Sequence, residues 1–303
     1  MDDAGLPGIL RRHAGPASDF LGLGARHTRF GEARYRVLPV PYESTTSYGG
    51  GTRGGPDAIL EASRQIELYD AELDSEPWIA GVCTLPAVGS HNQGPKAMAE
   101  VLEQIARSLR EPGRVVIALG GEHSITPPLA RPYMEDPEVW TLCVDAHADL
   151  RASYQGTSFS HACAMRPLAE TGRTVQVGVR SVSAEEMAWA RGRDLTILYD
   201  WELDDGGEWL DRVFETLGPK VYLSLDVDGL DPGIMPATGT PEPGGLSWRQ
   251  LASLLDRLGA QREVVAADIV ELAPIPGVHA PSFLAARAVY RLMGAIESGR
   301  KEG

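Results

Sequence analysis

The chain has 303 residues, a formal net charge of −14 at pH 7 and a sequence pI near 5.0. This acidity, with no run of Lys or Arg, argues against nucleic acid or an anionic membrane as a partner and favours a small cationic substrate. Neither a run of about 18 apolar residues nor a basic-then-apolar leader pattern occurs. We therefore expect a cytoplasmic protein.

Length and cysteine content indicate one folded unit. A chain of this length can bury a large core, and no Ser-, Pro- or Gln-rich linker divides it. We expect a single domain over residues 1–303, with residues 1–34 as an N-terminal extension. Cys83, Cys143 and Cys163 are too few, and odd in number, for a disulfide framework, so we expect them to pack in the core.

Short apolar runs alternate with longer amphipathic or alanine-rich segments, which is typical of strand–helix units on a parallel sheet. The pattern predicts an α/β fold with strands at residues 35–41, 79–85, 114–120, 140–145, 174–179, 195–199, 220–226 and 264–270. It predicts helices at residues 56–68, 95–110, 126–134, 184–191, 208–217, 247–258 and 282–297. Pro56 is expected in the first turn of one helix and Ser247 at the N-cap of another.

Several glycines between residues 49 and 55 follow the first predicted strand. A phosphate-binding loop is disfavoured there, because the Lys-Ser ending and the Gly-x-Gly-x-x-Gly spacing are missing. A mobile or substrate-facing loop is the preferred interpretation.

Metal-binding side chains follow the predicted strand at 140–145. Asp145, His147 and Asp149 occupy alternate positions. In extended backbone, residues two apart face the same way. This segment is therefore expected to present three ligands together.

Two other predicted strands end in groups of the same kind. Asp226 and Asp228 close the strand at 220–226, and His123 follows the strand at 114–120. In open α/β sheets, ligands bind outside the carboxyl ends of the strands. The three groups are thus expected to meet at one catalytic metal centre.

Charge and donor type indicate which ions such a centre would hold. Four aspartates about 4 Å apart would repel by roughly 4 kcal/mol per pair at an effective dielectric of about 20, and two divalent cations would cancel their charge. Oxygen and imidazole donors without thiolate suit manganese better than structural zinc. Two ions about 3.5–4 Å apart can activate a water for attack on an electrophilic carbon. The expected chemistry is hydrolysis.

Five motifs, in this order and spacing, resemble the ureohydrolases, the family of arginases and agmatinases. They are Gly-Gly-Glu-His-Ser at 120–124, Asp-Ala-His-Ala-Asp at 145–149, Ser-His at 160–161, Ser-Leu-Asp-Val-Asp-Gly-Leu-Asp-Pro at 224–232 and Asp-Ile-Val-Glu at 268–271. The resemblance spans nearly the whole chain from Tyr35 onward. It implies a three-layer α/β/α fold with an eight-stranded parallel sheet in the order 2-1-3-8-7-4-5-6. It also implies a homo-oligomer, either a trimer or a hexamer.

The resemblance further implies two Mn²⁺ ions per subunit. Each ion would have four protein ligands: His123, Asp145, Asp149 and Asp226 for one, and Asp145, His147, Asp226 and Asp228 for the other.

Three residues match catalytic positions of the family. Glu271 would hold the substrate guanidinium, to which a carboxylate presents a matching pair of oxygens. Asp149 would pass a proton to the leaving amine. His161 would shuttle protons or stabilise the leaving group.

The loop at 150–160 favours agmatine as the substrate, hydrolysed to putrescine and urea. Arginases use polar side chains, notably asparagines and serines, in this loop, and here it contains no asparagine. The segment Pro-Tyr-Glu-Ser-Thr-Thr-Ser-Tyr at 41–48 also resembles the agmatinases. Guanidinobutyrate, other ω-guanidino acids and arginine stay open as substrates, with Arg53 and Arg151 as candidate carboxylate partners. His279 is a candidate substrate contact.

Other classes of protein remain as alternatives. A metal-dependent deacylase shares the architecture but uses a different ligand pattern. Hydrolysis at a formimino carbon would release ammonia instead of urea. An inactive metal-binding scaffold is disfavoured by the complete ligand set together with His161 and Glu271.

Overall fold

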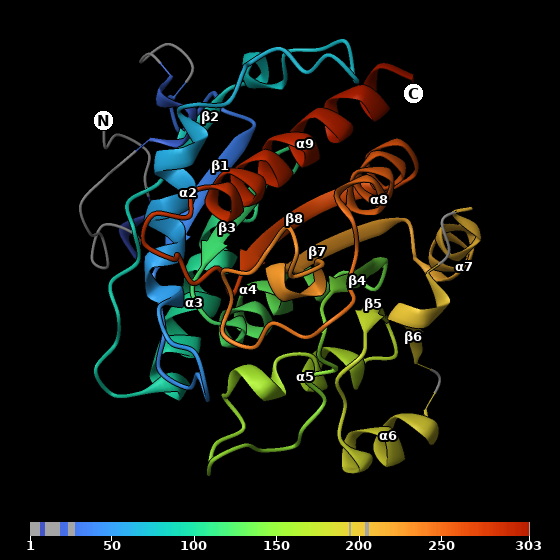
Figure 1. Ribbon diagram of the computed structural model, residues 1–303. Coiled ribbons are helices and arrows are strands. Elements are labelled where there is room, and N and C mark those ends of the chain that lie inside the picture. The colour runs from blue at the N-terminus through green and yellow to red at the C-terminus, as the bar shows by residue number, and fades with distance from the viewer. Residues whose placement is uncertain (1–6, 10–18, 24–27, 194, 204–205, 303) are drawn as a thin grey trace.

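The computed structural model describes residues 7–9, 19–23, 28–193, 195–203 and 206–302 (Figure 1). The strands in this part of the chain are β1 (Tyr35–Val40), β2 (Val82–Thr84), β3 (Val115–Gly120), β4 (Val139–Val144), β5 (Thr174–Val179), β6 (Thr196–Tyr199), β7 (Lys220–Asp226) and β8 (Glu263–Val270). The helices are α2 (Gly55–Ser63), α3 (Pro95–Leu109), α4 (Thr126–Met134), α5 (Arg166–Ala169), α6 (Ala184–Arg191), α7 (Glu208–Thr216), α8 (Trp248–Gln261) and α9 (Ala280–Glu302). Short 3-10 turns connect several of them.

All eight described strands pair in parallel within one sheet, in the order β2-β1-β3-β8-β7-β4-β5-β6. This confirms the fold and the strand order that the sequence predicted. The four central strands, β3, β8, β7 and β4, are the ones that the candidate ligands follow. The last strand of the chain, β8, lies between β3 and β7.

Helices cover both faces of the sheet (Figure 1). Along β3, Val115, Ile117 and Leu119 face one layer, and Val116 and Ala118 face the other. The first layer consists of α2, α7, α8 and α9, and the second of α3, α4, α5 and α6. Because a central parallel strand is buried on both faces, it reads as a continuous apolar run in the sequence.

Most predicted elements agree with the structure to within two residues at each end. The strand predicted at 79–85 is shorter than expected, because Pro77–Ala80 forms a 3-10 turn that ends at Gly81 with φ 84°. The helix predicted at 56–68 ends at Ser63. The final helix extends to Glu302, beyond its predicted end.

The described part of the N-terminal segment packs on this core. Phe20 and Leu21 are buried. Their backbone N–H groups donate to the hydroxyls of Thr84 and Ser63, at 2.8 Å each. Within the described residues, no helix combines the length and the apolar character needed to cross a bilayer.

Candidate metal centre

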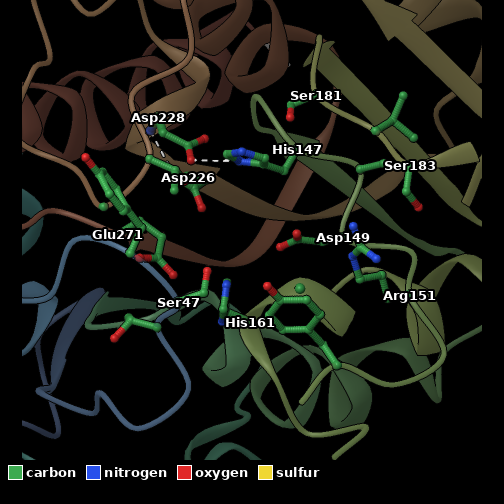
Figure 2. A pocket seen from close by; sticks show the side chains of 18 of the residues that line it. Ser47, His147, Asp149, Arg151, His161, Ser181, Ser183, Asp226, Asp228 and Glu271 are labelled. Atoms are coloured by element: carbon green, nitrogen blue, oxygen red, sulfur yellow. Dashed lines mark hydrogen bonds and ion pairs between the residues drawn. The ribbon is translucent and has the colours of Figure 1, made fainter. Parts of the chain in front are cut away.

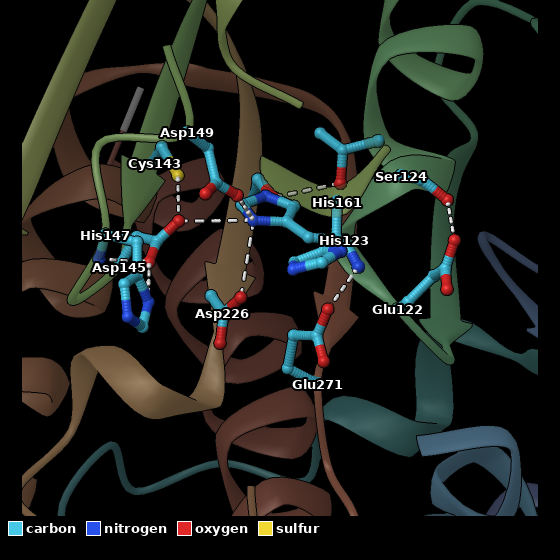
Figure 3. Close-up of polar contacts among 12 residues, drawn as sticks. Glu122, His123, Ser124, Cys143, Asp145, His147, Asp149, His161, Asp226 and Glu271 are labelled. Atoms are coloured by element: carbon cyan, nitrogen blue, oxygen red, sulfur yellow. Dashed lines mark hydrogen bonds and ion pairs between the residues drawn. The ribbon is translucent and has the colours of Figure 1, made fainter. Parts of the chain in front are cut away.

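The carboxyl ends of β3, β4 and β7 bring the predicted ligands together. In close-up, the carboxylates of Asp145, Asp149 and Asp226 surround the imidazole of His123 (Figure 3). His147 approaches Asp228 on the neighbouring side (Figure 2). Three separate segments of the sequence, which carry His123, Asp145 and Asp226, thus supply one cluster of side chains.

The carboxylate of Asp145 stabilises the loop that follows β4. Oδ1 of Asp145 accepts a 2.6 Å hydrogen bond from the His147 backbone N–H, and the Ala146 N–H donates to Asp228 Oδ1 at 3.1 Å. These bonds link the loops after β4 and β7. Asp149 then adopts φ 50°, a left-handed conformation that Asp tolerates better than most residues.

The loop after β7 is clamped by Arg180, which follows β5. Its guanidinium donates to the Asp228 carbonyl at 2.7 Å and to the Glu242 carbonyl at 3.0 Å. The Arg180 backbone N–H donates to the Ala146 carbonyl at 2.8 Å. Gly229 lets the loops approach closely, because a Cβ there would lie 2.8 Å from the Asp145 nitrogen.

The environment of His123 fits a metal ligand. Its Nδ1 is buried and forms no hydrogen bond of acceptable geometry with a described residue, although carboxylate oxygens of Asp145, Asp149 and Asp226 lie 3.1, 3.1 and 3.3 Å away. Oxygens gathered around a nitrogen in this way form a donor set for a cation. Burial lowers the pKa of His123, but these carboxylates outweigh it and raise the pKa well above its usual value.

A chain of two hydrogen bonds, from His123 through Ser224 to Asp268, determines which ring nitrogen of His123 carries the proton. The Ser224 hydroxyl donates to Asp268 Oδ1 at 2.6 Å, so its oxygen is free to accept from His123 Nε2, 3.1 Å away. In the neutral ring that a metal would bind, the lone pair would therefore be on Nδ1. Support of this kind behind a ligating histidine orients the ring and raises its basicity.

The second half of the cluster, around His147 and Asp228, also brings ionisable side chains into contact. His147 Nδ1 lies 3.0 Å from Asp228 Oδ2 and 3.7 Å from Asp145 Oδ1. Burial lowers the pKa of His147, but Asp228 and the other carboxylates raise it to about 11. Burial, then the charges of Asp149 and Asp228, raise the pKa of Asp145 to about 7. The pKa of Asp228 is lowered, because His147 and backbone donors outweigh its burial.

Glu271 follows β8 and faces the cluster from the other side (Figure 2). It adopts φ 64°, and its backbone N–H donates to the Gly121 carbonyl at 2.8 Å. Its Oε1 accepts a 2.6 Å hydrogen bond from the His123 backbone N–H. Burial, opposed by that N–H group, raises the pKa of Glu271 to about 8. One carboxylate oxygen is therefore anchored to the protein and the other is available to a ligand.

A cavity of about 270 Å³ opens over these residues. His147, Asp149, Asp226, Asp228 and Glu271 form its floor and one wall, and His161 borders it. Its outer part is lined by Arg151, Tyr154, Ser181, Ser183 and Glu186. Arg151 is partly neutralised there, because its Nε lies 3.9 Å from Glu186 Oε2 and its guanidinium lies 5.2 Å from the centre of the Tyr154 ring.

Two other residues singled out in the sequence lie elsewhere. Arg53 donates to the carbonyl of Glu43 and does not line the cavity. His279 is exposed and borders a separate apolar depression beside Phe283. Of the candidate carboxylate partners, only Arg151 reaches the cavity.

Cys143 lies beside the cluster, with its Sγ 4.0 Å from Asp145 Oδ2. Burial raises the pKa of the thiol, and ligand atoms of Cys143, His123 and Asp145 lie within 4.8 Å of one another. All three cysteines are buried free thiols, as the sequence predicted.

Arg180, Ser224 and Glu186 support the site and were not predicted from the sequence. Arg180 and Glu186 act through backbone groups of distant loops, which leave no periodic signal. Ser224 lies inside a quoted motif, but its role depends on the neighbouring strand β8, which supplies Asp268.

Buried aspartates and histidines at the carboxyl ends of a parallel sheet of this order define an arginase-like metal hydrolase. The model of the Arginase family matches residues 33–294. The chain belongs to the arginase family.

Individual relatives cover nearly all of the chain. N(1)-aminopropylagmatine ureohydrolase of Thermus thermophilus is 40% identical over 90% of this chain and 94% of its own length. The Synechocystis protein of the same name is 37% identical over 91% and 93%. The solved structure of agmatine ureohydrolase of Thermoplasma volcanium superposes with a TM-score of 0.86 at 30% identity, covering 98% of this chain and 99% of that one.

Proposed function

We propose that this hydrolase removes the amidino group of agmatine as urea, leaving putrescine. The charge of the cavity carries the proposal. Two divalent ions would neutralise the four aspartates, which leaves Glu186 and Glu271 against Arg151 among the other charged side chains of the lining. Burial favours the protonated form of Glu271, but a guanidinium bound beside it would favour the charged form. The remaining balance of one negative charge favours a cationic substrate without a carboxylate.

The donors fit two ions in the sites that the family resemblance implies. His123 and Asp149 would belong to one ion, His147 and Asp228 to the other, and Asp145 and Asp226 to both. Oxygen and imidazole donors suit Mn²⁺. Such ions supply an activated water for attack on the guanidinium carbon.

The protein groups around the cavity have distinct proposed roles. Glu271, anchored through Oε1, holds the substrate guanidinium with its other oxygen. Asp149 would pass the proton of the activated water to the leaving amine. His161, at the border of the cavity, delivers a proton to the product nitrogen.

N(1)-aminopropylagmatine is a second candidate substrate, because polar side chains besides the proposed ligands line the cavity. Beyond Asp149, the lining continues to Ser181, Ser183 and the carboxylate of Glu186. The two ureohydrolases of Thermus and Synechocystis carry this substrate in their names.

Urea release tests both substrates. The Mn²⁺-loaded protein is assayed with agmatine, N(1)-aminopropylagmatine, arginine, guanidinobutyrate and guanidinopropionate, against a metal-stripped control. Metal-dependent turnover of agmatine is expected, and a higher kcat/KM for the aminopropyl compound would assign the longer substrate. Preference for an acid would contradict the charge argument, and the release of ammonia without urea would identify deimination of the guanidino group to a ureido product.

We also propose that the chain forms a homo-oligomer, a trimer or a hexamer. Ile275, Val278 and Phe283 are each about 40% exposed and lie close together in the sequence at the start of α9. Exposed apolar side chains grouped in this way are typical of interfaces. Light scattering after gel filtration measures the assembly, and a monomeric mass would refute it.

A further inference from the structure

The hydroxyl of Thr45 has all of its hydrogen-bonding capacity directed at two residues. It donates to Glu122 Oε1 at 2.9 Å and accepts from the His161 backbone N–H at 3.0 Å. Its oxygen also lies 3.2 Å from His161 Nδ1. A hydroxyl has one donor and two acceptor sites, so these three contacts account for all of them.

The direction of the Thr45 hydrogen is set by Glu122, whose side chain is buried. Oε2 of Glu122 accepts from the backbone N–H groups of Ser44 and Thr45, at 2.6 Å each. Its Oε1 accepts from the Ser124 hydroxyl at 2.6 Å as well as from Thr45 (Figure 3). Both carboxylate oxygens of Glu122 thus act as acceptors, and Thr45 is the donor in its contact with Oε1, so the Thr45 hydrogen points to Glu122.

With its only hydrogen directed at Glu122, Thr45 can meet His161 Nδ1 only as an acceptor. We propose that Thr45 and Glu122 are positioning residues that hold neutral His161 in the tautomer with the proton on Nδ1 and the lone pair on Nε2. The inference rests on the proposed function for the role of His161, and it goes further by naming the groups that prepare this residue.

The chain of hydrogen bonds from His161 through Thr45 to Glu122 resembles the one behind His123, but it places the proton on the other ring nitrogen. Asp268 and Ser224 place the proton of His123 on Nε2 and free Nδ1 for a metal. Glu122 and Thr45 place the proton of His161 on Nδ1 and free Nε2. Each histidine is thus prepared by a carboxylate acting through a hydroxyl.

Ser160 is the competing partner of the same nitrogen. Its hydroxyl lies 3.4 Å from His161 Nδ1, longer than the 3.2 Å contact with Thr45 and outside the usual range of about 2.7–3.2 Å. A hydrogen donated by Ser160 would impose the opposite tautomer. The two hydroxyls therefore make opposite predictions that substitutions can separate.

The assigned tautomer suits a group that first takes up a proton and later gives it away. Nε2 can accept a proton in the cavity and then donate it to the leaving amine, while the Nδ1–H stays bound to Thr45. Tyr154 fixes the ring from the side, with ring centres 5.9 Å apart and an interplanar angle of 86°.

Nitrogen NMR of the full-length protein tests the tautomer without substrate. The protein is labelled with ¹⁵N-histidine and loaded with Zn²⁺, which is diamagnetic, and long-range ¹H–¹⁵N correlations are recorded over a series of pH values. The chain has seven histidines, and the missing signals of His161→Asn assign His161. We expect a protonated-type shift for Nδ1 and a bare-type shift for Nε2 in the neutral ring. The reverse pattern in the wild type would overturn the proposal.

Substitutions then identify the source of the tautomer. Thr45→Val is expected to shift His161 toward the Nε2–H form and to lower kcat about ten- to hundredfold with little change in KM, because general acid–base catalysis contributes about 10²–10⁴. Thr45→Ser should restore both. Thr52→Val is the matched control, because the buried Thr52 hydroxyl has no hydrogen-bond partner among the described residues.

Two further results separate the possible failures. If Ser160→Ala moves the tautomer and Thr45→Val does not, Ser160 is the determinant and the proposal is wrong. If the Nδ1–H form and the Thr45 effect on the spectrum are found while none of the five guanidino compounds yields urea, the proposed function fails and the hydrogen-bond relay stands.

Discussion

The guanidinium of Arg180 donates a 2.7 Å hydrogen bond to the main-chain carbonyl of Asp228. The same residue holds the Ala146 carbonyl through its backbone N–H. Ala146 lies between Asp145 and His147, so Arg180 joins the two loops that present the proposed ligands of one ion. None of its contacts involves His123, on the other side of the cluster.

Arg180→Ala should therefore weaken one metal site selectively. Loss of a group that supports a ligand typically lowers metal affinity about 10- to 100-fold, and we expect binding to fall from two ions toward one at limiting Mn²⁺. Elemental analysis and calorimetric titration measure this. Arg173→Ala is the matched control, because Arg173 precedes β5 and also binds backbone carbonyls, those of Met134, Asp136 and Val139, away from the cluster. Equal metal loss in both variants would contradict the assignment.

Asp149→Asn and Asp228→Asn should each remove a different ion. Asp149 contacts His123, and Asp228 contacts His147, so each aspartate belongs to one half of the cluster. Asn tolerates the left-handed backbone at position 149, so the fold should be retained. Both variants are expected to lose urea release and to bind one ion. Full activity of either would remove that aspartate from the proposed centre.

Glu271→Gln should raise KM for the guanidino substrate about ten- to hundredfold, because a hydrogen bond to a charged group contributes about 1.5–3 kcal/mol. Glutamine keeps the carbonyl oxygen that accepts from the His123 N–H. Steady-state kinetics measure the effect. Metal content, measured on the same sample, should stay at the wild-type value. An unchanged KM would exclude Glu271 from guanidinium binding.

The metal-free protein should lose stability as the pH rises from about 5 to 8. Asp145 and Glu271 have pKa values raised to about 7 and about 8, above the usual 3.8 and 4.5. The folded state therefore binds more protons than the unfolded state in this range, and stability falls with pH. The raised pKa of His147 acts in the same direction above about 6.5. Asp228, with a lowered pKa, contributes a constant amount throughout this window.

Thermal unfolding in a chelator, measured at several pH values, tests this dependence. Saturating Mn²⁺ should abolish or reverse the slope, because metal binding requires deprotonated ligands. Glu271→Gln should reduce the slope in the chelator. A melting temperature that stays level or rises with pH in the metal-free wild type would contradict the raised pKa values.

The sequence predicted the sheet well because its strands are buried on both faces. The runs at 174–179 and 220–226 are apolar and end sharply, and they coincide with β5 and β7. Prediction was poorest where tertiary contacts determine the end of a helix or strand. The hydroxyl of Ser63 bonds the Leu60 carbonyl and the Leu21 N–H at the point where α2 ends. No local sequence pattern predicts that contact.

The candidate site was also predictable where it depends on local sequence patterns, and not where it depends on contacts between distant segments. Aspartates and histidines at alternate positions after strands form a local pattern, and the structure brings them together. The functions of Thr45, Arg180 and Ser224 depend on partners from other strands and loops. Thr45 meets Glu122 across 77 residues of sequence and Arg180 meets Asp228 across 48, so their roles became visible only in three dimensions.

The strand that unites the site, β8, is also the last in sequence of the strands that the structure describes. β8 separates β3, which precedes His123, from β7, which carries Asp226. A nascent chain that ends before residue 263 therefore contains all of the proposed metal ligands but lacks the strand that sets β3 and β7 at their proper spacing. The capacity to retain metal should thus arise only after residues 263–270 have been synthesised and have entered the sheet between β3 and β7.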